Sequence, residues 1–157
     1  MLLTSSAFPQ GAEIPSFYTA DGENISPELS WQDAPPQTKS FALVVHDPDA
    51  PIPGGFTHWV LYNIPADLGH IEEKVPAEEQ LPGLGMQGRN DGGKIGYIGP
   101  APPSGTHRYF FRLFALDKIL DLPPGATHKQ LSAATKGHIL AQAELMGTYE
   151  KKSERAA

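Results

Sequence analysis

The stretch His107–Leu116 reads HRYFFRLFAL and is the longest run of strand-forming residues in the chain. Successive side chains of a strand point to opposite faces, so the alternation in this run places Arg108 and Arg112 together on one face. The opposite face then carries His107, Tyr109, Phe111 and Leu113. This stretch therefore predicts a half-buried strand that presents an imidazole and a phenol side by side.

Two further runs predict buried strands. Ser40–His46 reads SFALVVH and Phe56–Ile64 reads FTHWVLYNI, and both are bounded by residues typical of turns. Weaker strand signals lie at Ala12–Tyr18, Glu28–Trp31 and Gly96–Ile98. Because only one helix is indicated, the crossovers that parallel strands need are lacking, and antiparallel pairing is expected.

The indicated helix runs from Lys129 to Met146. Thr127 with Gln130 three residues later has the form of a capping box, and Gly147 stands where a C-terminal glycine belongs. Residues on one side recur at spacings of three and four, namely Leu131, Ala134, His138, Ala141 and Leu145. The pattern predicts an amphipathic helix that covers a sheet, with His138 as a core histidine.

Glycine and proline make up an unusual share of the chain, with sixteen of each among 157 residues. Twenty of these thirty-two lie between Pro48 and Gly105, which predicts long loops on a rigid frame, where binding sites usually lie. The length is that of one domain, residues 1–157. The absence of cysteine excludes disulfides and thiolate metal ligands.

Charge and hydropathy argue against nucleic acid and membranes. A net charge of -6 has the wrong sign for a general binder of nucleic acid or anionic lipid surfaces. Met1–Phe8 lacks the basic start and long apolar core of a secretory signal. No apolar run approaches the roughly 20 residues that span a bilayer. We therefore expect a cytoplasmic protein without stable membrane insertion.

Two segments combine histidine with turn-forming residues. His46–Pro51 reads HDPDAP, in which the carboxylates could fix a histidine tautomer, bind a cation or hold a proton. The same hexapeptide could equally be a turn whose aspartates bond their own backbone. In Gly54–Trp59 (GGFTHW), paired glycines allow close approach of a ligand or backbone. His58 is predicted to share a strand face with Val60, Tyr62 and Ile64.

The third segment is the loop Gly96–Gly105, which leads into His107 and Tyr109. An imidazole and a phenol two residues apart on a strand can hydrogen-bond an oxyanion such as phosphate or carboxylate. Arg108 points the other way and is expected to pair with a carboxylate across the sheet.

Other chemistries have weaker support. The chain contains no G-x-S-x-G elbow, no H-E-x-x-H motif and no phosphate-binding P-loop. A hydrolase that uses the Asp–His cluster ranks low, because no nucleophile with an adjacent base is evident. A metal site has no diagnostic ligand spacing among the residues that could form one, which are His46, Asp47, Asp49, His58 and His107. Neither a metal nor a cofactor is expected.

Four motifs in order resemble the phosphatidylethanolamine-binding protein (PEBP) family, in the bacterial branch known as Raf kinase inhibitor-like proteins. They are NISPELSW (Asn24–Trp31), VVHDPDAP (Val44–Pro51), THWVLYNIP (Thr57–Pro65) and GYIGPAPPSGTHRYFFRLFALD (Gly96–Asp117). The resemblance implies a mainly β fold of antiparallel Greek-key sheets, with one main helix in the C-terminal half and long Gly/Pro-rich loops.

The resemblance also implies a small anion pocket for phosphate-like or phospholipid head groups. Carried over residue by residue, its ligand-binding set would be Asp47, Pro51, His58, Gly99, Pro102, His107 and Tyr109. The expected function is that of a non-enzymatic binding protein; the alternative is an interaction module that inhibits a protease or modulates a kinase. Bacterial relatives suggest a homodimer. We expect Asp47 to accept a hydrogen bond from His58 or His107 and so to favour protonation of that imidazole.

Overall fold

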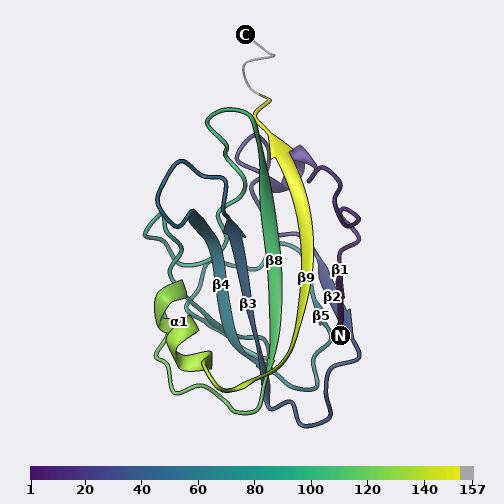
Figure 1. Ribbon diagram of the computed structural model, residues 1–157, viewed down its shortest axis with the longest axis vertical. Helices are drawn as coiled ribbons and strands as arrows, with labels where there is room; N and C mark the ends of the chain where they lie inside the picture. The colour runs from purple at the N-terminus through teal and green to yellow at the C-terminus, as the bar shows by residue number, and fades with distance from the viewer. Residues whose placement is uncertain (153–157) are drawn as a thin grey trace.

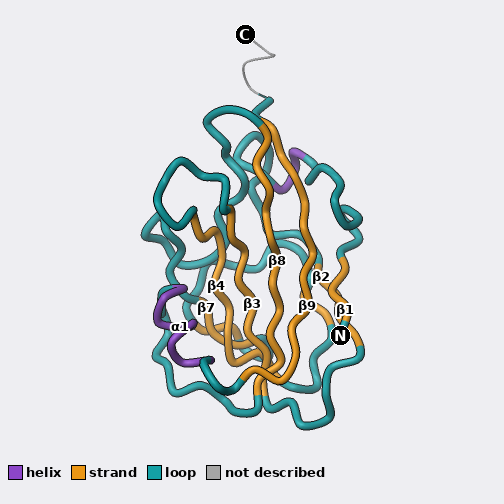
Figure 2. The backbone as a smooth tube through the Cα atoms, viewed as in Figure 1, coloured by secondary structure: helices purple, strands orange, loops and turns teal. Residues whose placement is uncertain are grey.

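Antiparallel strands dominate the computed structural model, which describes residues 1–152 (Figures 1 and 2). The strands are β1 (Leu2–Thr4), β2 (Leu29–Gln32), β3 (Ser40–Asp47), β4 (Phe56–Pro65), β5 (His70–Ile71), β6 (Gln80–Leu81), β7 (Gly85–Gln87), β8 (Thr106–Leu116) and β9 (Ile139–Glu150). A 3-10 helix covers Ser16–Tyr18, and α1 covers His128–Thr135. The three strong strand predictions correspond to β3, β4 and β8 and are confirmed.

The strands form two sheets. The larger has the order β6-β7-β4-β3-β8-β9, and the smaller has the order β1-β2-β5. Within the larger sheet, β4 lies between β3 and β7, β6 is at the edge beyond β7, and β8 returns to lie on the other side of β3. The resulting order β8-β3-β4-β7 is that of a Greek key. All of the pairings between these strands are antiparallel, so the predicted fold class is confirmed.

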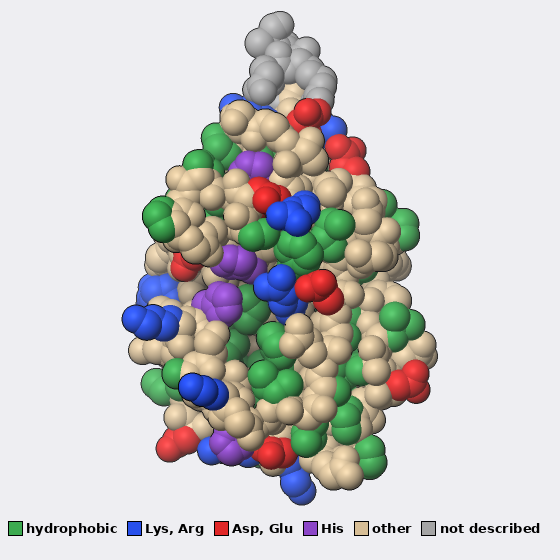
Figure 3. All heavy atoms as spheres, viewed as in Figure 1, with side chains coloured by type: hydrophobic (Ala, Val, Ile, Leu, Met, Phe, Trp, Pro, Cys, Tyr) green, Lys and Arg blue, Asp and Glu red, His purple; other side chains and the backbone are tan. Residues whose placement is uncertain are grey.

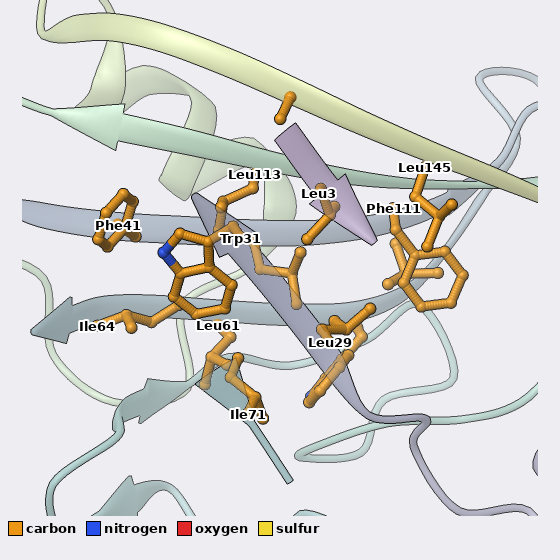
Figure 4. Packing of buried hydrophobic residues seen from close by; sticks show 14 of the residues in the cluster. Leu3, Leu29, Trp31, Phe41, Leu61, Ile64, Ile71, Phe111, Leu113 and Leu145 are labelled. Carbon is orange, nitrogen blue, oxygen red and sulfur yellow. The ribbon is translucent and has the colours of Figure 1, made fainter. Parts of the chain in front are cut away.

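The core lies mainly between the two sheets. From β3, Phe41 packs in one cluster with Leu29 and Trp31 of β2 (Figure 4). Leu43 of β3 belongs to the same cluster. Ala42 and Val44, which alternate with them, point the other way and belong to a second cluster on the side of α1. Alternation along β3 thus buries both faces of the strand, because each face has its own cover.

The predicted helix is correct in its first half and wrong in its second. The capping box exists: Thr127 Oγ1 accepts from the Gln130 backbone N–H, and Gln130 Oε1 accepts from the Thr127 N–H. The helix then ends at Thr135, and Gly137 takes a φ of 82°, which favours glycine and leaves the helical region. From Ile139 onward the chain is β9, which pairs along β8.

The second half of the predicted helix fits a strand pattern as well as a helical one, which explains why it is a strand. The apolar residues of 139–146 recur at spacings of two as well as of four, and pairing with β8 decides between the two. Leu145, for example, is buried in β9 opposite Phe111. His138 is not a core histidine; its Nδ1 lies 2.8 Å from Asp117 Oδ1 in a half-exposed pair. Gly147 does not end a helix but lies within β9, opposite Tyr109.

Of the weaker strand predictions, Glu28–Trp31 is confirmed as β2. Gly96–Ile98 is loop, not strand. Ala12–Tyr18 is also not a strand: it ends in the 3-10 helix, and only its start touches the sheet edge, where the Ile14 N–H donates to the Thr148 carbonyl. Within residues 1–152, no helix has the length and apolar character needed to cross a membrane.

Candidate functional site

A cavity of about 370 Å³ lies at the end of the larger sheet where β3 ends and β4 and β8 begin. We call it the Asp47 cavity. Its lining includes all seven residues that the sequence predicts for an anion pocket, namely Asp47, Pro51, His58, Gly99, Pro102, His107 and Tyr109. The remaining lining residues are apolar: Ala50, Ile52, Phe56, Ile98, Ala101 and Pro103.

Asp47 is the buried carboxylate of this cavity. Its Oδ2 lies 2.6 Å from His107 Nδ1, so of the two histidines that could donate to it, His107 does. Its Oδ1 accepts from the Asp49 backbone N–H at 2.8 Å. The two interpretations of HDPDAP are therefore both correct, because one oxygen orients an imidazole while the other closes a turn.

Asp49, by contrast, is held away from the cavity. Arg108 Nε lies 2.9 Å from Asp49 Oδ2, and Arg108 Nη2 lies 2.9 Å from Oδ1. Hydrogen bonds from this guanidinium lower the pKa of Asp49 to about 2. The prediction that Arg108 pairs with a carboxylate is confirmed, and Asp49 serves to fix the loop after β3.

His58 reaches the cavity through a β-bulge. Val45 pairs with Trp59 while His46 pairs with Thr57, so His58 is an extra residue in β4. Such a residue interrupts the alternation and redirects a side chain. The predicted face shared with Val60 is therefore wrong. His58 instead lies against Tyr109, with ring centroids 5.2 Å apart.

The rest of that predicted face is correct for Val60 and Tyr62 and wrong for Ile64. Tyr62 packs with Val60 on the side of α1, whereas Ile64 belongs to the core between the sheets. A second register shift, between Phe41 and Leu43 of β3 and their partners in β4, separates them.

Each of the two cavity histidines uses one ring nitrogen in a hydrogen bond to the protein. His58 Nδ1 lies 2.6 Å from the Ile98 carbonyl, and since a carbonyl only accepts, this nitrogen carries the proton. Burial lowers the pKa of His58, so its imidazole is neutral at neutral pH. Its Nε2 is then a bare acceptor. His107 likewise donates from Nδ1 to Asp47 and keeps Nε2 for another partner.

Tyr109 contributes an unused donor. Its hydroxyl is buried and has no hydrogen-bond partner within residues 1–152. Burial raises the pKa of Tyr109, as do the charge of the nearby Asp47 carboxylate and a weak hydrogen-bond interaction with it, so the phenol keeps its proton; Asp47 does not come within full hydrogen-bonding geometry of the hydroxyl. A protonated hydroxyl without an acceptor is available to bind one.

The Gly99 loop depends on residues that sequence reasoning missed. The Gly99 N–H donates to Asn24 Oδ1 at 2.8 Å, and a Cβ built on Gly99 would lie 2.6 Å from the Tyr18 carbonyl oxygen. Glycine is therefore required where this backbone crosses the 3-10 helix region. Asn24 lies in the NISPELSW motif, which could have flagged it; the Ile98 carbonyl is backbone and has no sequence signal.

The cavity offers hydrogen-bonding groups rather than metal ligands. No group of three or more His, Asp or Glu side chains in the described part of the chain is arranged to hold a metal ion. A hydroxyl donor and two imidazoles that become donors when protonated suit an oxyanion.

Comparison with known proteins identifies the family of this chain. A family model described as phosphatidylethanolamine-binding protein matches residues 4–150. The chain belongs to this family. Within the PEBP family, it is 53% identical over 151 residues to a UPF0098 protein of Methanothermobacter thermautotrophicus, covering 96% of this chain and 99% of the relative.

Two solved structures share the fold. The structure of a PEBP homologue from Chlamydia trachomatis has a TM-score of 0.88 at 43% identity and covers 96% of this chain and 97% of its own. Escherichia coli YbcL, described as a member of the mammalian PEBP family, has a TM-score of 0.85 at 32% identity, covering 96% of this chain and 98% of its own.

Proposed function

We propose that this PEBP-family member is a binding protein that holds a small phosphate-like anion in the Asp47 cavity and carries out no chemical step on it. The observation that carries the proposal is the Tyr109 hydroxyl, which is buried in the cavity wall without a partner within residues 1–152. Leaving a buried donor unpaired costs about 1–3 kcal/mol. An anionic oxygen in the cavity would supply the missing acceptor.

The two histidines favour an anion that carries one proton. Neutral His58 offers an acceptor at Nε2, because its Nδ1 proton is donated to the Ile98 carbonyl. A monohydrogen phosphate or a phosphomonoester can donate its O–H there and accept from Tyr109 through another oxygen. If an imidazole takes up a proton instead, its Nε2–H becomes a charged donor to the same anion.

The carboxylate of Asp47 does not oppose this function. It accepts a hydrogen bond from His107 Nδ1 at 2.6 Å and so fixes the ring by that nitrogen, which leaves Nε2 for a ligand. Local charges decide the balance, since a pair 4 Å apart interacts by about 4 kcal/mol at an effective dielectric of 20. Charges beyond about 8 Å are screened in physiological salt, so the net charge of -6 matters little here.

The rim favours an anion attached to an apolar group. Pro51, Ile52, Pro102 and Pro103 line the cavity, and Ile52 is 51% exposed. A phospholipid head group would place its phosphate inside and its apolar part against this rim. Inorganic phosphate, phosphoethanolamine and lysophosphatidylethanolamine form a series that separates the contribution of the anion from that of the rim.

The lining supports binding rather than hydrolysis. Its residues include no serine, threonine or lysine, and the chain has no cysteine. The hydroxyl in the lining is that of Tyr109, whose raised pKa keeps it protonated. The Asp47–His107 pair therefore has no serine, threonine, lysine or cysteine nucleophile to activate in the cavity.

The test is calorimetric titration of inorganic phosphate and phosphoethanolamine into the wild type, His107→Ala and Tyr109→Phe. We expect both variants to bind at least roughly tenfold more weakly, which corresponds to the loss of one hydrogen bond to a charged group. His138→Ala removes a histidine outside the cavity and should bind like the wild type. Unchanged affinity in both cavity variants would refute the proposal.

A protein ligand is the second candidate, favoured by the exposure of Ile52 at the rim. A phosphorylated side chain of a kinase or protease partner would enter the cavity while its flanking residues contact Ile52. In that case a phosphoserine peptide binds more tightly than free phosphoserine, and Ile52→Ser removes only the extra affinity. Equal affinity for the peptide and the free amino acid argues against a protein ligand.

A further inference from the structure

A second cavity, of about 300 Å³, lies on the side of the larger sheet covered by α1. We call it the helix groove. Its apolar surface comes from Val44, Phe114, Leu131 and Ile139, and its polar rim includes His128 and Lys136. Figure 3 views this side of the sheet, where hydrophobic side chains (green) and histidines (purple) gather over the strands beside α1. It shares no lining residue with the Asp47 cavity.

A chain of hydrogen bonds behind the groove fixes a histidine tautomer. His46 Nε2 lies 2.9 Å from the Gly54 carbonyl oxygen, and a carbonyl oxygen only accepts, so Nε2 carries the proton of the neutral ring. His46 Nδ1 is then an acceptor. It lies 3.0 Å from Thr57 Oγ1, and the hydroxyl proton of Thr57 therefore points to His46.

The chain continues to the groove. Thr57 Oγ1 also lies 2.8 Å from His128 Nδ1. Because the single hydroxyl proton is used toward His46, the oxygen must accept from His128, and Nδ1 of His128 carries a proton. A neutral imidazole has one proton, so Nε2 of His128 is a bare acceptor. Burial lowers the pKa of His128, and the ring stays neutral at neutral pH.

The charge at the groove is positive. No aspartate or glutamate is among its lining residues, and the formal charge in that set is the ammonium group of Lys136, an exposed residue at the C-terminal end of α1. His128 and Lys136 are eight residues apart, which is about 12 Å along a helix. A ligand that uses both needs a hydrogen-bond donor at one end, an acid at the other and an apolar body between them.

We propose that the helix groove binds a small aromatic carboxylate that carries a ring N–H or hydroxyl group. The ring lies on the apolar surface of Val44, Phe114 and Leu131, the N–H or O–H donates to His128 Nε2, and the carboxylate pairs with Lys136. The cavity volume is at the lower end of the range of small-molecule sites, about 300–1,000 Å³, which suits one fused ring system with a short acid.

The test uses indole-3-propionate as the probe, with backbone amide NMR shifts as the readout. We expect saturable shifts at Leu131 and Ile139 in the wild-type protein. The 1-methylindole analogue lacks the N–H and should bind roughly fivefold more weakly or worse, because it leaves the His128 acceptor unpaired. The alcohol analogue, 3-(indol-3-yl)propan-1-ol, lacks the charge that Lys136 recognises.

Two lysine variants on the same helix complete the test. Lys136→Gln should weaken indole-3-propionate by roughly two- to fivefold, as expected for an exposed ion pair, and leave the alcohol analogue unaffected. Lys129→Gln makes the same charge change outside the groove and should have no effect. The proposal is overturned if the groove amides do not shift, if only the Asp47 cavity responds, if N-methylation leaves affinity unchanged, or if the two lysine variants behave alike.

Discussion

The Nδ1 atom of His107 lies 2.6 Å from Oδ2 of Asp47 and thereby connects the start of β8 to the end of β3. Both side chains are almost fully buried, with 2% of Asp47 and 6% of His107 exposed. Water therefore cannot replace either partner. The pair fixes the imidazole of the Asp47 cavity and also contributes to the stability of this end of the sheet.

Asp47→Asn should lower the free energy of unfolding by about 1–3 kcal/mol. The carboxylate accepts from two donors, His107 Nδ1 and the Asp49 N–H, whereas an amide has one acceptor oxygen and turns its NH₂ group toward the other donor. Urea denaturation followed by tryptophan fluorescence measures the loss. Asp67→Asn, on an exposed turn, should change stability by less than about 0.5 kcal/mol. Equal losses in the two variants would contradict a specific role of the Asp47 pair.

Tyr109→Phe should leave the protein as stable as the wild type or make it more stable, although it weakens anion binding. The variant removes a buried hydroxyl that has no partner within residues 1–152 and so removes a desolvation cost. Tyr62→Phe is the matched control, because the Tyr62 hydroxyl donates to the Pro123 carbonyl and accepts from the Ala126 N–H. That variant should lose about 1–2 kcal/mol. A destabilised Tyr109→Phe would mean that its hydroxyl already has a partner.

The carboxyl group of Asp49 should titrate with a pKa of about 2 because of its hydrogen bonds from Arg108. The carboxyl ¹³C shift of Asp49 across pH 1.5–5 measures this value, and in Arg108→Gln the midpoint should move up toward the ordinary 3.8. The unfolded chain binds this proton more readily, so the stabilisation is present above about pH 4 and is lost as the pH falls toward 2. An unchanged midpoint in Arg108→Gln would exclude the guanidinium as the cause.

Strand alternation and motif order predicted much of the fold and site. The prediction that His107 and Tyr109 share one face follows from the alternation of side chains in an uninterrupted strand. The first residues of β8 keep that alternation. The same reasoning assigned His58 to the wrong strand face. The bulge at His58 is set by the register of β3 against β4, and the sequence contains no signal for it. The Ile98 carbonyl was missed because any residue supplies the same atom.

The mistaken second half of the helix has a different cause. Residues 139–146 satisfy both a helical and a strand period, and local propensity does not separate them. Their pairing with β8, which precedes them by about thirty residues, does. Gly137 was the available signal: placed after a capping box and before an apolar run, it reads as a helix end as readily as a tolerated interior glycine.

Gly99→Ala should change the shape of the Asp47 cavity without altering any of its polar side chains. The added Cβ would lie 2.4 Å from Asn24 Oδ1 and 2.6 Å from the Tyr18 carbonyl, so the loop must shift, at a cost of about 1–3 kcal/mol. Phosphate affinity should fall with it. Gly93→Ala places a Cβ in open space at a φ of 79°; it should lose about 1–2 kcal/mol through backbone strain alone and keep its phosphate affinity. Equal phosphate affinity in the two variants would show that the loop does not shape the cavity.

Phosphate should stabilise the protein against unfolding most strongly at acid pH, because protonated His58 binds it. Burial lowers the pKa of this imidazole below its ordinary 6.5, so between the two values the unfolded chain binds more protons than the folded one. The free energy of unfolding therefore falls as the pH drops through this window. An anion that accepts from protonated Nε2 raises the folded pKa and reduces that fall, so phosphate affinity itself should increase toward acid pH.

Urea denaturation between pH 7.5 and pH 5, with phosphate or with chloride at equal ionic strength, measures this linkage. In His58→Gln the acid-side loss should shrink, and most of the phosphate protection should vanish. His128→Gln is the matched control, since burial also lowers the pKa of His128 but its ring lies outside the Asp47 cavity. In His128→Gln, the part of the pH dependence of stability that comes from His128 should disappear, and phosphate should stabilise the variant as it stabilises the wild type. Protection by phosphate that is equal at both ends of this pH range would rule out coupling between the anion and His58.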